Sequence, residues 1–223
     1  MAATRSTVAA ILVAAGSGQR LGADGPKAFC LVRGRTLLEY AHSRFVAHPL
    51  IRDVIVVAPP DYVDEAKTLT GATVVAGGAT RQASVAAGLA AVDSDVDAVL
   101  VHDVARAFVP AAVIDRVVEA LAAGADAVIP VRPVTDTIKR VDDARRVVDT
   151  VDRSTLVAVQ TPQGFRRSVL VAAHRAAPDA AATDDAGLVE AYGGAVVVVD
   201  GADESFKITH PWDLVLAEAV VDR

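Results

Sequence analysis

A glycine-rich segment follows the first apolar run of the chain. The run that begins at Val8 leads into the sequence SGQRLGADGPKAF, and this region contains Gly16, Gly18, Gly22 and Gly25. Because glycine has no side chain, the backbone N–H groups of such a loop can approach a ligand closely and can adopt positive φ angles. Backbone N–H groups that follow a strand are common donors to phosphate oxygens. The segment therefore predicts a site for an anion such as a nucleoside triphosphate.

Two cations, Arg20 and Lys27, lie in the same segment and could neutralise phosphate charge. The segment differs from the Walker pattern, because Lys27 stands between Pro26 and Ala28 and no Ser or Thr follows it. It also differs from the dinucleotide pattern G-x-G-x-x-G, because Gly22 follows Gly18 by four residues instead of three. A dehydrogenase is therefore disfavoured. A glycine-rich surface turn with solvated cations is the structural alternative for this segment.

A second polar segment, GGATRQAS, follows the strand-like run Thr73–Ala76. Thr80 is a plausible N-cap for a helix that begins at Arg81, and the first turn of that helix offers N–H groups to an anion or a base edge. Ser84 lies one turn further on and faces the same way. The alternative is a solvated arginine at a helix start with a serine on the helix surface.

A third segment, HDVAR, follows the run Ala98–Val101. A carboxylate directly after a buried strand is costly unless it has a role, and Asp103 could hold the Mg²⁺ ion that a triphosphate carries. Arg106 lies close enough to share this pocket. An aspartate that caps the next helix is the alternative. His102 is expected to pack or to form hydrogen bonds, because no second His or Cys has metal-ligand spacing to it.

Lys207 stands between Phe206 and Ile208, after the strand-like run Val196–Val199. Apolar neighbours would shield its charge partly from water and so strengthen its electrostatic effect. The other histidines, which are His42, His48, His174 and His210, show no grouping, and no role is assigned to them.

The elements that must position these residues alternate between strand-like and helical runs. The strand-like runs are Val8–Val13, Val54–Ala58, Thr73–Ala76, Ala98–Val101, Ala127–Ile129 and Val196–Val199. The runs with helical apolar spacing are Leu37–Ala47, Arg81–Val92 and Ala111–Ala123. This alternation predicts an α/β protein with a Rossmann-like, mostly parallel sheet flanked by helices, in one domain over residues 1–223. Ligands of such sheets bind beyond the carboxyl ends of the strands, where all four polar segments fall.

One region breaks the alternation. Residues Thr135–Val151 read as two β-type runs around the polar turn Asp142–Arg145, which predicts a protruding β-hairpin arm rather than a crossover helix. An isolated hairpin is marginally stable in water, so this arm is expected to rest on a second subunit and to form a homodimer. Thr137 and Arg153 would gain a role if the arm brought them to a second anionic substrate. By default they lie on a solvated strand surface.

The composition of the 223-residue chain limits the classes of protein to which it can belong. Hydrophobic residues make up 52% and aromatic residues only 4%, which is typical of buried parallel strands with alanine-rich helices. The net charge of −6 disfavours a nucleic-acid partner. The single cysteine, Cys30, indicates a reducing compartment. No apolar run reaches the roughly 18 residues of a membrane span and no signal peptide is evident, so we expect a cytoplasmic protein without a membrane partner.

Taken in order over nearly the whole chain, these segments resemble the 2-C-methyl-D-erythritol 4-phosphate cytidylyltransferase family of the non-mevalonate isoprenoid pathway. The motifs that carry the resemblance are AAGSGQRLG with PK, GGATRQAS, HDVAR, DTIKR, TVDRS, QTPQGF, TDDAGLVE and FKIT. The resemblance implies that CMP is transferred from CTP to a methylerythritol phosphate with release of pyrophosphate. It also implies a divalent cation, Mg²⁺ or another, and an arm that embraces the partner subunit.

The resemblance further implies roles for individual residues. Arg20 and Lys27 would stabilise charge at the α-phosphate, with Lys207 as a third catalytic cation that also faces the second substrate. The expected nucleotide-binding residues are Ala14, Ala15, Gly16, Gly18, Gly78, Arg81 and Ser84. The expected residues of the second-substrate region are Asp103, Arg106, Thr137 and Arg153, with Asp103 also serving the metal. Ala79 stands where an acidic residue is common in the family, which leaves one cytosine contact open.

Two other functions are compatible with the same motifs. A cytidylyltransferase that acts on ribitol 5-phosphate would share the CTP loops and differ around Arg106, Thr137 and Arg153. A catalytically silent nucleotide-binding or regulatory subunit is the second alternative. The presence of Arg20, Lys27, Asp103 and Lys207 together argues against it, because a binding module has no use for cations directed at the scissile phosphate.

Overall fold

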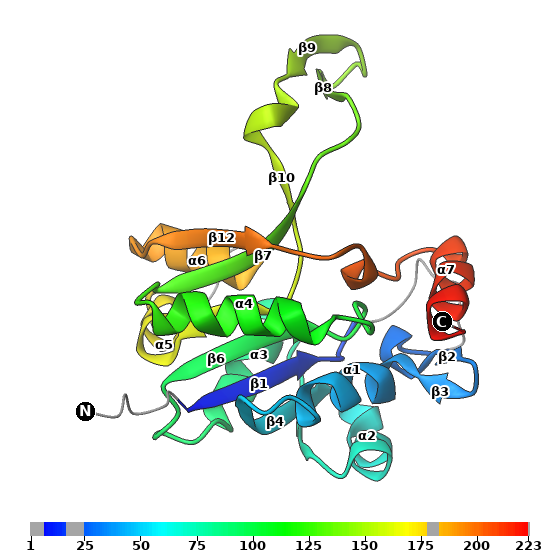
Figure 1. Cartoon of the computed structure of the whole chain (residues 1–223), viewed down its shortest axis with the longest axis vertical. Helices are drawn as coiled ribbons and strands as arrows, with labels where there is room; N and C mark the ends of the chain where they lie inside the picture. The colour runs from blue at the N-terminus through cyan, green and yellow to red at the C-terminus, as the bar shows by residue number, and fades with distance from the viewer. Residues whose placement is uncertain (1–6, 17–24, 178–182, 223) are drawn as a thin grey trace.

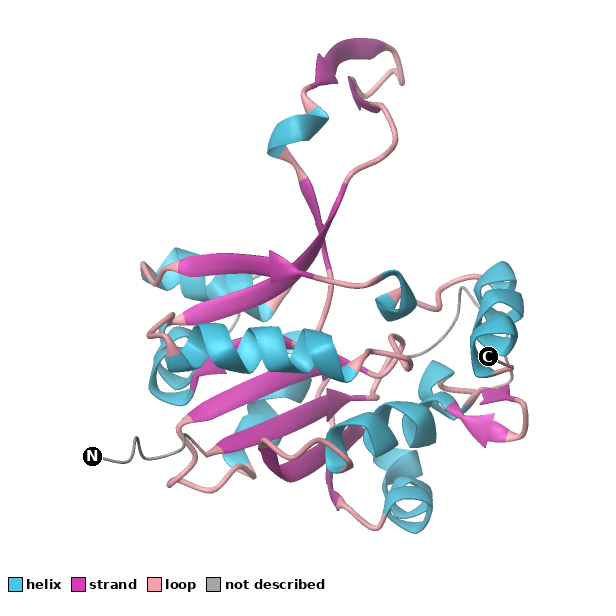
Figure 2. Cartoon of the chain, viewed as in Figure 1, coloured by secondary structure: helices cyan, strands magenta, loops and turns pink. Residues whose placement is uncertain are grey.

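A central β-sheet with a layer of helices on each face forms the body of the molecule, as the computed structural model of residues 7–16, 25–177 and 183–222 shows (Figure 1). Coloured by secondary structure, the strands run through the middle of the body and the helices cover them (Figure 2). The strands of the main sheet are β1 (Val8–Val13), β4 (Ile51–Ala58), β5 (Thr73–Ala76), β6 (Ala98–Asp103), β7 (Ala127–Pro133), β10 (Val157–Val159), β11 (Gln163–Arg166) and β12 (Val196–Asp200).

The strand order makes β1 an interior strand, two places from the edge strand β5. β1 pairs in parallel with β4 on one side and with β6 on the other, and β4 pairs in parallel with β5. β12 pairs in parallel with β7. However, β11 lies between β6 and β7 and is antiparallel to both of them. β10 pairs antiparallel with the C-terminal end of β7. The prediction of a mostly parallel sheet flanked by helices is confirmed, and β10 and β11 are additions to it.

Helices pack on both faces of the sheet because its strands are apolar on both faces. Ala10 and Leu12 of β1 belong to one core cluster, whereas Ala9 and Ile11 belong to the other, and all four side chains are buried. The helices on the first face are α1 (Leu37–Val46), α2 (Val63–Thr70), α4 (Ala111–Ala122) and α7 (Pro211–Val221). The helices on the second face are α3 (Arg81–Ala90), α5 (Arg167–Ala176) and α6 (Asp185–Tyr192).

Local capping defines several helix starts. Thr36 and Glu39 form a capping box at α1, and Thr80 accepts a hydrogen bond from the backbone of Ala83 at α3, as its sequence position predicts. Asp184 caps α6 by accepting a hydrogen bond from Gly187. Before α1, a short pair of strands, β2 (Leu31–Val32) and β3 (Arg35–Thr36), turns the chain.

The strand ends match the expectations closely but not completely. β1 and β5 have the predicted bounds, whereas β4 begins at Ile51, three residues before the predicted start at Val54. β6 extends to Asp103, so this carboxylate stands on the last residue of the strand rather than after it. Parallel pairing of Asp103 with Val13 brings it to the point where β1 also ends.

A hairpin arm projects away from the body of the molecule (Figure 1). Its strands β8 (Ile138–Val141) and β9 (Val147–Val151) pair antiparallel with each other in a separate sheet, which agrees with the predicted hairpin. Val141, Val147 and Val148 on the arm are each more than half exposed. Their exposure leaves apolar surface on the arm that the described chain does not cover.

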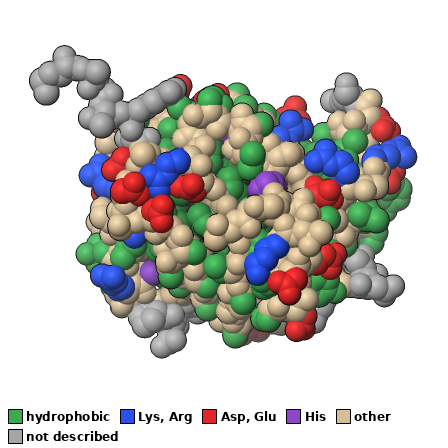
Figure 3. Space-filling model, turned by 90° about the horizontal axis from the view of Figure 1, so that it is seen from below, with side chains coloured by type: hydrophobic (Ala, Val, Ile, Leu, Met, Phe, Trp, Pro, Cys, Tyr) green, Lys and Arg blue, Asp and Glu red, His purple; other side chains and the backbone are tan. Residues whose placement is uncertain are grey.

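The surface of the body carries charges of both signs. On the face that Figure 3 shows, Lys and Arg side chains lie among Asp and Glu side chains rather than in a continuous basic stripe. Over the ranges described, every helix is too short or too polar to span a bilayer.

Candidate active site

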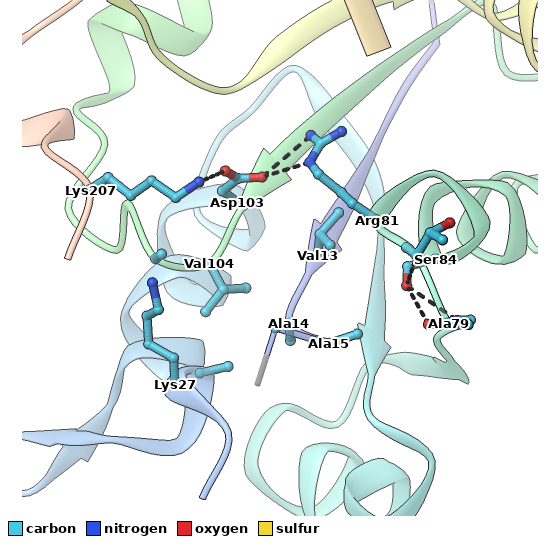
Figure 4. A pocket seen from close by; sticks show the side chains of 15 residues that line it. Val13, Ala14, Ala15, Lys27, Ala79, Arg81, Ser84, Asp103, Val104 and Lys207 are labelled. Carbon is cyan, nitrogen blue, oxygen red and sulfur yellow. Dashed lines mark hydrogen bonds and ion pairs between the residues drawn. The ribbon is translucent and has the colours of Figure 1, made fainter. Parts of the chain in front are cut away.

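A pocket opens where β1, β5 and β6 end, at the edge of the sheet at which the sequence predicts a ligand site. Its volume is about 610 Å³, and it lies between the loop after β1, the N-terminus of α3 and the segment that follows β12 (Figure 4). The described residues that line it are Val13, Ala14, Ala15, Gly16, Lys27, Ala28, Gly78, Ala79, Thr80, Arg81, Ser84, Asp103, Val104, Ala105 and Lys207. The pocket therefore brings together most of the predicted nucleotide and catalytic residues.

One wall of the pocket is built from small residues and backbone. A Cβ atom on Gly77 would lie 2.7 Å from the Cβ of Ala15 and 2.9 Å from the Oγ of Ser84, and one on Gly78 would lie 2.5 Å from the Cβ of Ala83. Ser84 is buried, and its hydroxyl accepts a hydrogen bond from the Gly78 N–H at 3.2 Å. Only glycine fits this turn, and Ser84 fixes it from behind, so the wall can lie flat against a planar ligand.

The opposite wall carries alternating charges. Lys207 Nζ donates to Asp103 Oδ2 at 2.7 Å, and Arg81 donates through Nε and Nη2 to Asp103 Oδ1 at 3.3 Å (Figure 4). Behind Arg81, its Nη1 donates to Asp185 Oδ2 at 2.6 Å. His174 Nε2 lies 2.9 Å from the other Asp185 oxygen. Together these five residues form a continuous line from the core to the pocket.

The ion pairs favour the charged forms of Asp103 and Arg81. Burial opposes ionisation of Asp103, but attraction by Arg81 and Lys207 outweighs it and holds the pKa of that carboxyl well below its usual range. Burial also acts to lower the pKa of the Arg81 guanidinium, but Asp185 and Asp103 together raise it. Asp103 and Arg81 therefore remain charged throughout the neutral range.

Lys27 approaches the same wall from another direction. It begins a short helical turn after Pro26, and its Nζ donates to the carbonyl oxygen of Ile208 at 2.8 Å. Because Ile208 follows Lys207 directly, this hydrogen bond ties the Pro26 turn to the segment that carries the second lysine. Two of the three predicted catalytic cations are thus brought together.

Several predicted residues lie elsewhere. Gly18 and Arg20 fall outside the described residues. Arg106 does not line the pocket, because its guanidinium donates to the carbonyl oxygens of Ser205 at 2.8 Å and Val159 at 3.0 Å. Thr137 and Arg153 are exposed on the arm, and Arg153 donates to the backbone carbonyl of Thr135 within the arm. Binding of a second substrate by these three residues stays a prediction.

Two residues next to the pocket, His174 and Asp185, were given no role in the sequence analysis. His174 contacts Asp185, and both side chains are buried. The signal available in the sequence was the pair Asp184–Asp185 in TDDAGLVE: one aspartate is enough to cap a helix, so the second needed another partner. His102 behaves as predicted, since it is fully buried and contacts Thr161 Oγ1 at 3.0 Å and the Arg106 carbonyl oxygen at 3.2 Å.

The donor set offers limited support to a divalent cation. Over the described ranges, no group of three or more His, Cys, Asp or Glu side chains is arranged to hold a metal ion. Asp103 is the one carboxylate among the described lining residues, and both of its oxygens accept hydrogen bonds from cations. Magnesium in nucleotide sites commonly uses one or two carboxylates with phosphate oxygens and water. Asp103 fits that pattern as a single ligand, once a bound nucleotide supplies the phosphate oxygens.

Fold and pocket together define an α/β nucleotidyltransferase, with small residues on one wall, charged side chains on the other and both at the carboxyl ends of parallel strands. The family model for 2-C-methyl-D-erythritol 4-phosphate cytidylyltransferase matches residues 8–223. The chain belongs to this family, and it is a cytidylyltransferase by that membership.

Individual relatives agree with the family model. The chain is 51% identical over 218 residues to the 2-C-methyl-D-erythritol 4-phosphate cytidylyltransferase of Frankia casuarinae, covering 97% of this chain and 82% of that protein. It is 50% identical over 225 residues to that of Rhodococcus jostii, covering 100% and 99%. Among solved structures, the enzyme of the same description from Thermus thermophilus has a TM-score of 0.83 at 42% identity, covering 97% of this chain and 100% of that one.

Proposed function

We propose that this enzyme transfers CMP from CTP to 2-C-methyl-D-erythritol 4-phosphate, giving 4-diphosphocytidyl-2-C-methyl-D-erythritol and pyrophosphate. The observation that carries the proposal is the convergence of Lys27, Lys207 and Arg81 on one pocket beside the wall of Gly78 and Ala15. The reaction serves non-mevalonate isoprenoid precursor synthesis. The names of the relatives from Frankia and Rhodococcus support the same activity.

The reaction depends on fixed positive charges and on the alignment of the two substrates more than on proton transfer. The acceptor phosphate carries about −1.5 to −2 charge at neutral pH, so it attacks the α-phosphorus of CTP without a general base. A new phosphorus–oxygen bond forms, the bond between the α-phosphorus and the bridging oxygen breaks, and its electron pair leaves with pyrophosphate. Two polyanions must therefore meet in line while fixed cations offset the repulsion.

The side chains of the pocket can be divided between these tasks. The flat wall formed by Ala14, Ala15 and Gly78, backed by Ser84, accepts the cytosine ring. Lys27 and Lys207, held beside each other through the Ile208 carbonyl, act on the phosphates. Arg20, which lies outside the described residues, joins them in the proposal as the third cation at the α-phosphate.

A divalent cation accompanies CTP in this proposal, and Asp103 would be its protein ligand. When bound, the cation neutralises part of the triphosphate charge and so lowers the repulsion between the two substrates. Lys207 leaves Asp103 as the nucleotide enters, because the ammonium group can pair with phosphate instead. Magnesium is the expected ion.

We also propose a homodimer formed through the hairpin arm. Exposed Val141, Val147 and Val148 give the arm an apolar surface, and an isolated two-stranded hairpin gains stability by packing on another surface. In the dimer, Thr137 and Arg153 would reach the acceptor in the partner's pocket. Sedimentation equilibrium tests this arrangement: the parent chain should be dimeric, and V147D/V148D should shift it toward monomer.

Pyrophosphate release tests the proposed reaction. The purified chain receives CTP with 2-C-methyl-D-erythritol 4-phosphate, with ribitol 5-phosphate or with no acceptor, each with and without Mg²⁺. Release that depends on the methylerythritol phosphate and on Mg²⁺ is expected. Faster release with ribitol 5-phosphate would reassign the acceptor, and no release with either acceptor would indicate a silent nucleotide-binding subunit. Neither alternative is favoured by the relatives.

A further inference from the structure

A buried carboxylate lies behind the pocket, on the side of Arg81 opposite Asp103. Asp185 is the first residue of α6, and its side chain is 1% exposed. Its Oδ2 accepts a hydrogen bond from Arg81 Nη1 at 2.6 Å, and its Oδ1 lies 2.9 Å from His174 Nε2. The Arg81 guanidinium is thus held between one buried carboxylate and one that faces the pocket.

The two carboxylates differ in what a ligand can do to them. Asp103 is 15% exposed, shares its charge with Lys207 and contacts Arg81 at 3.3 Å. An incoming triphosphate competes with Asp103 for both cations, so this pair can rearrange when the site fills. Asp185 is sealed from the pocket and makes the shorter contact, so its pair with Arg81 does not exchange in this way.

The position of Asp185 is itself fixed by neighbouring elements. His174 reaches it from α5, and because a carboxylate only accepts, the His174 Nε2 atom carries the proton in this contact. Gln163 of β11 donates through Nε2 to the Asp184 carboxylate at 2.6 Å, and Asp184 caps the same helix. Asp185 therefore has little freedom to follow Arg81 if the guanidinium moves.

The same short segment of chain also locates Asp103. Thr161 Oγ1 accepts a hydrogen bond from the Asp103 backbone N–H at 3.1 Å, and Gln163 lies two residues further on. The segment that contains Thr161 and Gln163 therefore sets the separation of the two carboxylates, and with it the place where Arg81 can pair with both. This arrangement is a rigid frame for one guanidinium.

We infer that Asp185 is a positioning residue for the nucleotide half of the site, acting through Arg81, with His174 fixing its orientation. This inference rests on the proposed function, with Arg81 as the nucleotide-binding residue that the sequence analysis expects. Without the Asp185 carboxylate, Arg81 pairs with Asp103 alone or turns toward solvent. Its guanidinium is then no longer held in the position that binds the nucleotide. CTP binding should weaken, whereas the KM for the acceptor should stay close to that of the parent enzyme.

A double-mutant cycle tests this inference. The variants are Asp185→Asn, Arg81→Gln, their combination and the matched control Asp184→Asn, which alters the neighbouring carboxylate but does not contact Arg81. The dissociation constant of CTP is measured by titration calorimetry. Asp185→Asn should raise it about tenfold in the parent and leave it unchanged within about twofold when Arg81 is already Gln, the coupling expected for groups in direct contact. Asp184→Asn should raise it by less than about threefold, since asparagine also caps helices well.

A structural readout separates this inference from the proposed function. In a crystal structure of ligand-free Asp185→Asn, the Arg81 guanidinium should have moved from its present place between positions 103 and 185. If the parent chain released no pyrophosphate, the proposed function would fail, and this displacement would still decide the role of Asp185. An Arg81 side chain that stayed in place would overturn the inference.

Two further outcomes would also overturn it: an equal loss of CTP affinity with and without Arg81, which indicates general disruption, or no loss at all. Should Asp185→Asn not fold, His174→Phe takes its place, because it keeps a ring in the helix interface and removes the donor to Asp185. Its loss of CTP affinity should also disappear in the Arg81→Gln background. A loss that persisted there would count against the inference.

Discussion

The Nζ atom of Lys207 lies 2.7 Å from Oδ2 of Asp103, although the two residues are 104 positions apart in the chain. Asp103 ends β6, and Lys207 lies in the segment between β12 and α7. The Lys207 side chain is 42% exposed, so the ammonium group lies at the mouth of the pocket rather than in the core. A ligand with several phosphate charges can therefore draw it away from Asp103 at modest cost.

Replacing Lys27 by Ala should lower the turnover number by about 10²–10³, the scale of losing one preorganised contact to the transition state. The reason is that Lys27 is already held beside Lys207 by the Ile208 carbonyl. Steady-state kinetics with both substrates saturating measures the effect. Lys67→Ala, which removes an exposed lysine paired only with Asp64 on α2, is the control and should leave turnover unchanged. Near-normal turnover of the Lys27 variant would remove that residue from the mechanism.

A methyl group added at Gly77 should impair nucleotide binding by moving the flat wall. The new Cβ would lie 2.7 Å from Ala15 Cβ and 2.9 Å from Ser84 Oγ, both in pocket residues. Overpacking of this kind costs about 1–3 kcal/mol. If that cost is paid when the wall has to fit CTP, the dissociation constant of CTP should rise about fivefold to 150-fold in calorimetry. Adding Ala15→Gly removes one of the two clashes and should restore part of the affinity. A Gly77→Ala enzyme that binds CTP normally would show that the wall does not contact the base.

The buried imidazole of His102 should make the protein sensitive to mild acid. Burial lowers its pKa to about 4, so the unfolded chain takes up a proton between about pH 6.5 and 4 while the folded chain does not. Stability therefore falls as the pH falls through this window, by up to about 1.4 kcal/mol per pH unit from this group. The low pKa of Asp103 places its own loss of stability at more acid pH.

Urea denaturation of the parent and of His102→Gln at several pH values between 4 and 7 measures this contribution. The variant is expected to be less stable at pH 7, because it loses the contacts of the ring with Thr161 and the Arg106 carbonyl. The decisive quantity is the slope of the unfolding free energy against pH, which should be shallower in the variant. Equal slopes in the two proteins would exclude His102 as the source.

Replacing Arg153 by Ala should raise the KM for the sugar phosphate and leave the KM for CTP close to the parent value. The side chain is exposed, and in the proposed dimer it would face the acceptor rather than the wall of small residues that accepts the cytosine ring. Arg145→Ala, in the exposed turn of the same arm, is the matched control. An equal rise of both KM values in the Arg153 variant would contradict its assignment to the acceptor.

Local features of the sequence were sufficient to predict much of the pocket wall that is built from small residues. The apolar run Val8–Val13, the glycines at 77 and 78, and Thr80 as the cap of α3 all act through neighbours in the chain. Because periodicity, capping and the conformational freedom of glycine depend on a few adjacent residues, they can be recognised without knowing the fold. The antiparallel strand β11 escaped prediction because its four residues include Gln163 and Gly164, which carry no strand pattern.

The sequence by itself determined which residues could carry chemistry and at which strand ends they stand. Only the tertiary structure decided which of them meet: Lys207 with Asp103, Asp185 behind Arg81, and Arg106 directed at the backbone instead of the pocket. The physical reason is that these contacts depend on the order of strands in the sheet. β11 lies between β6 and β7 in this order and pairs with both. Such pairings join segments that are far apart in the chain, so no local sequence pattern reveals them.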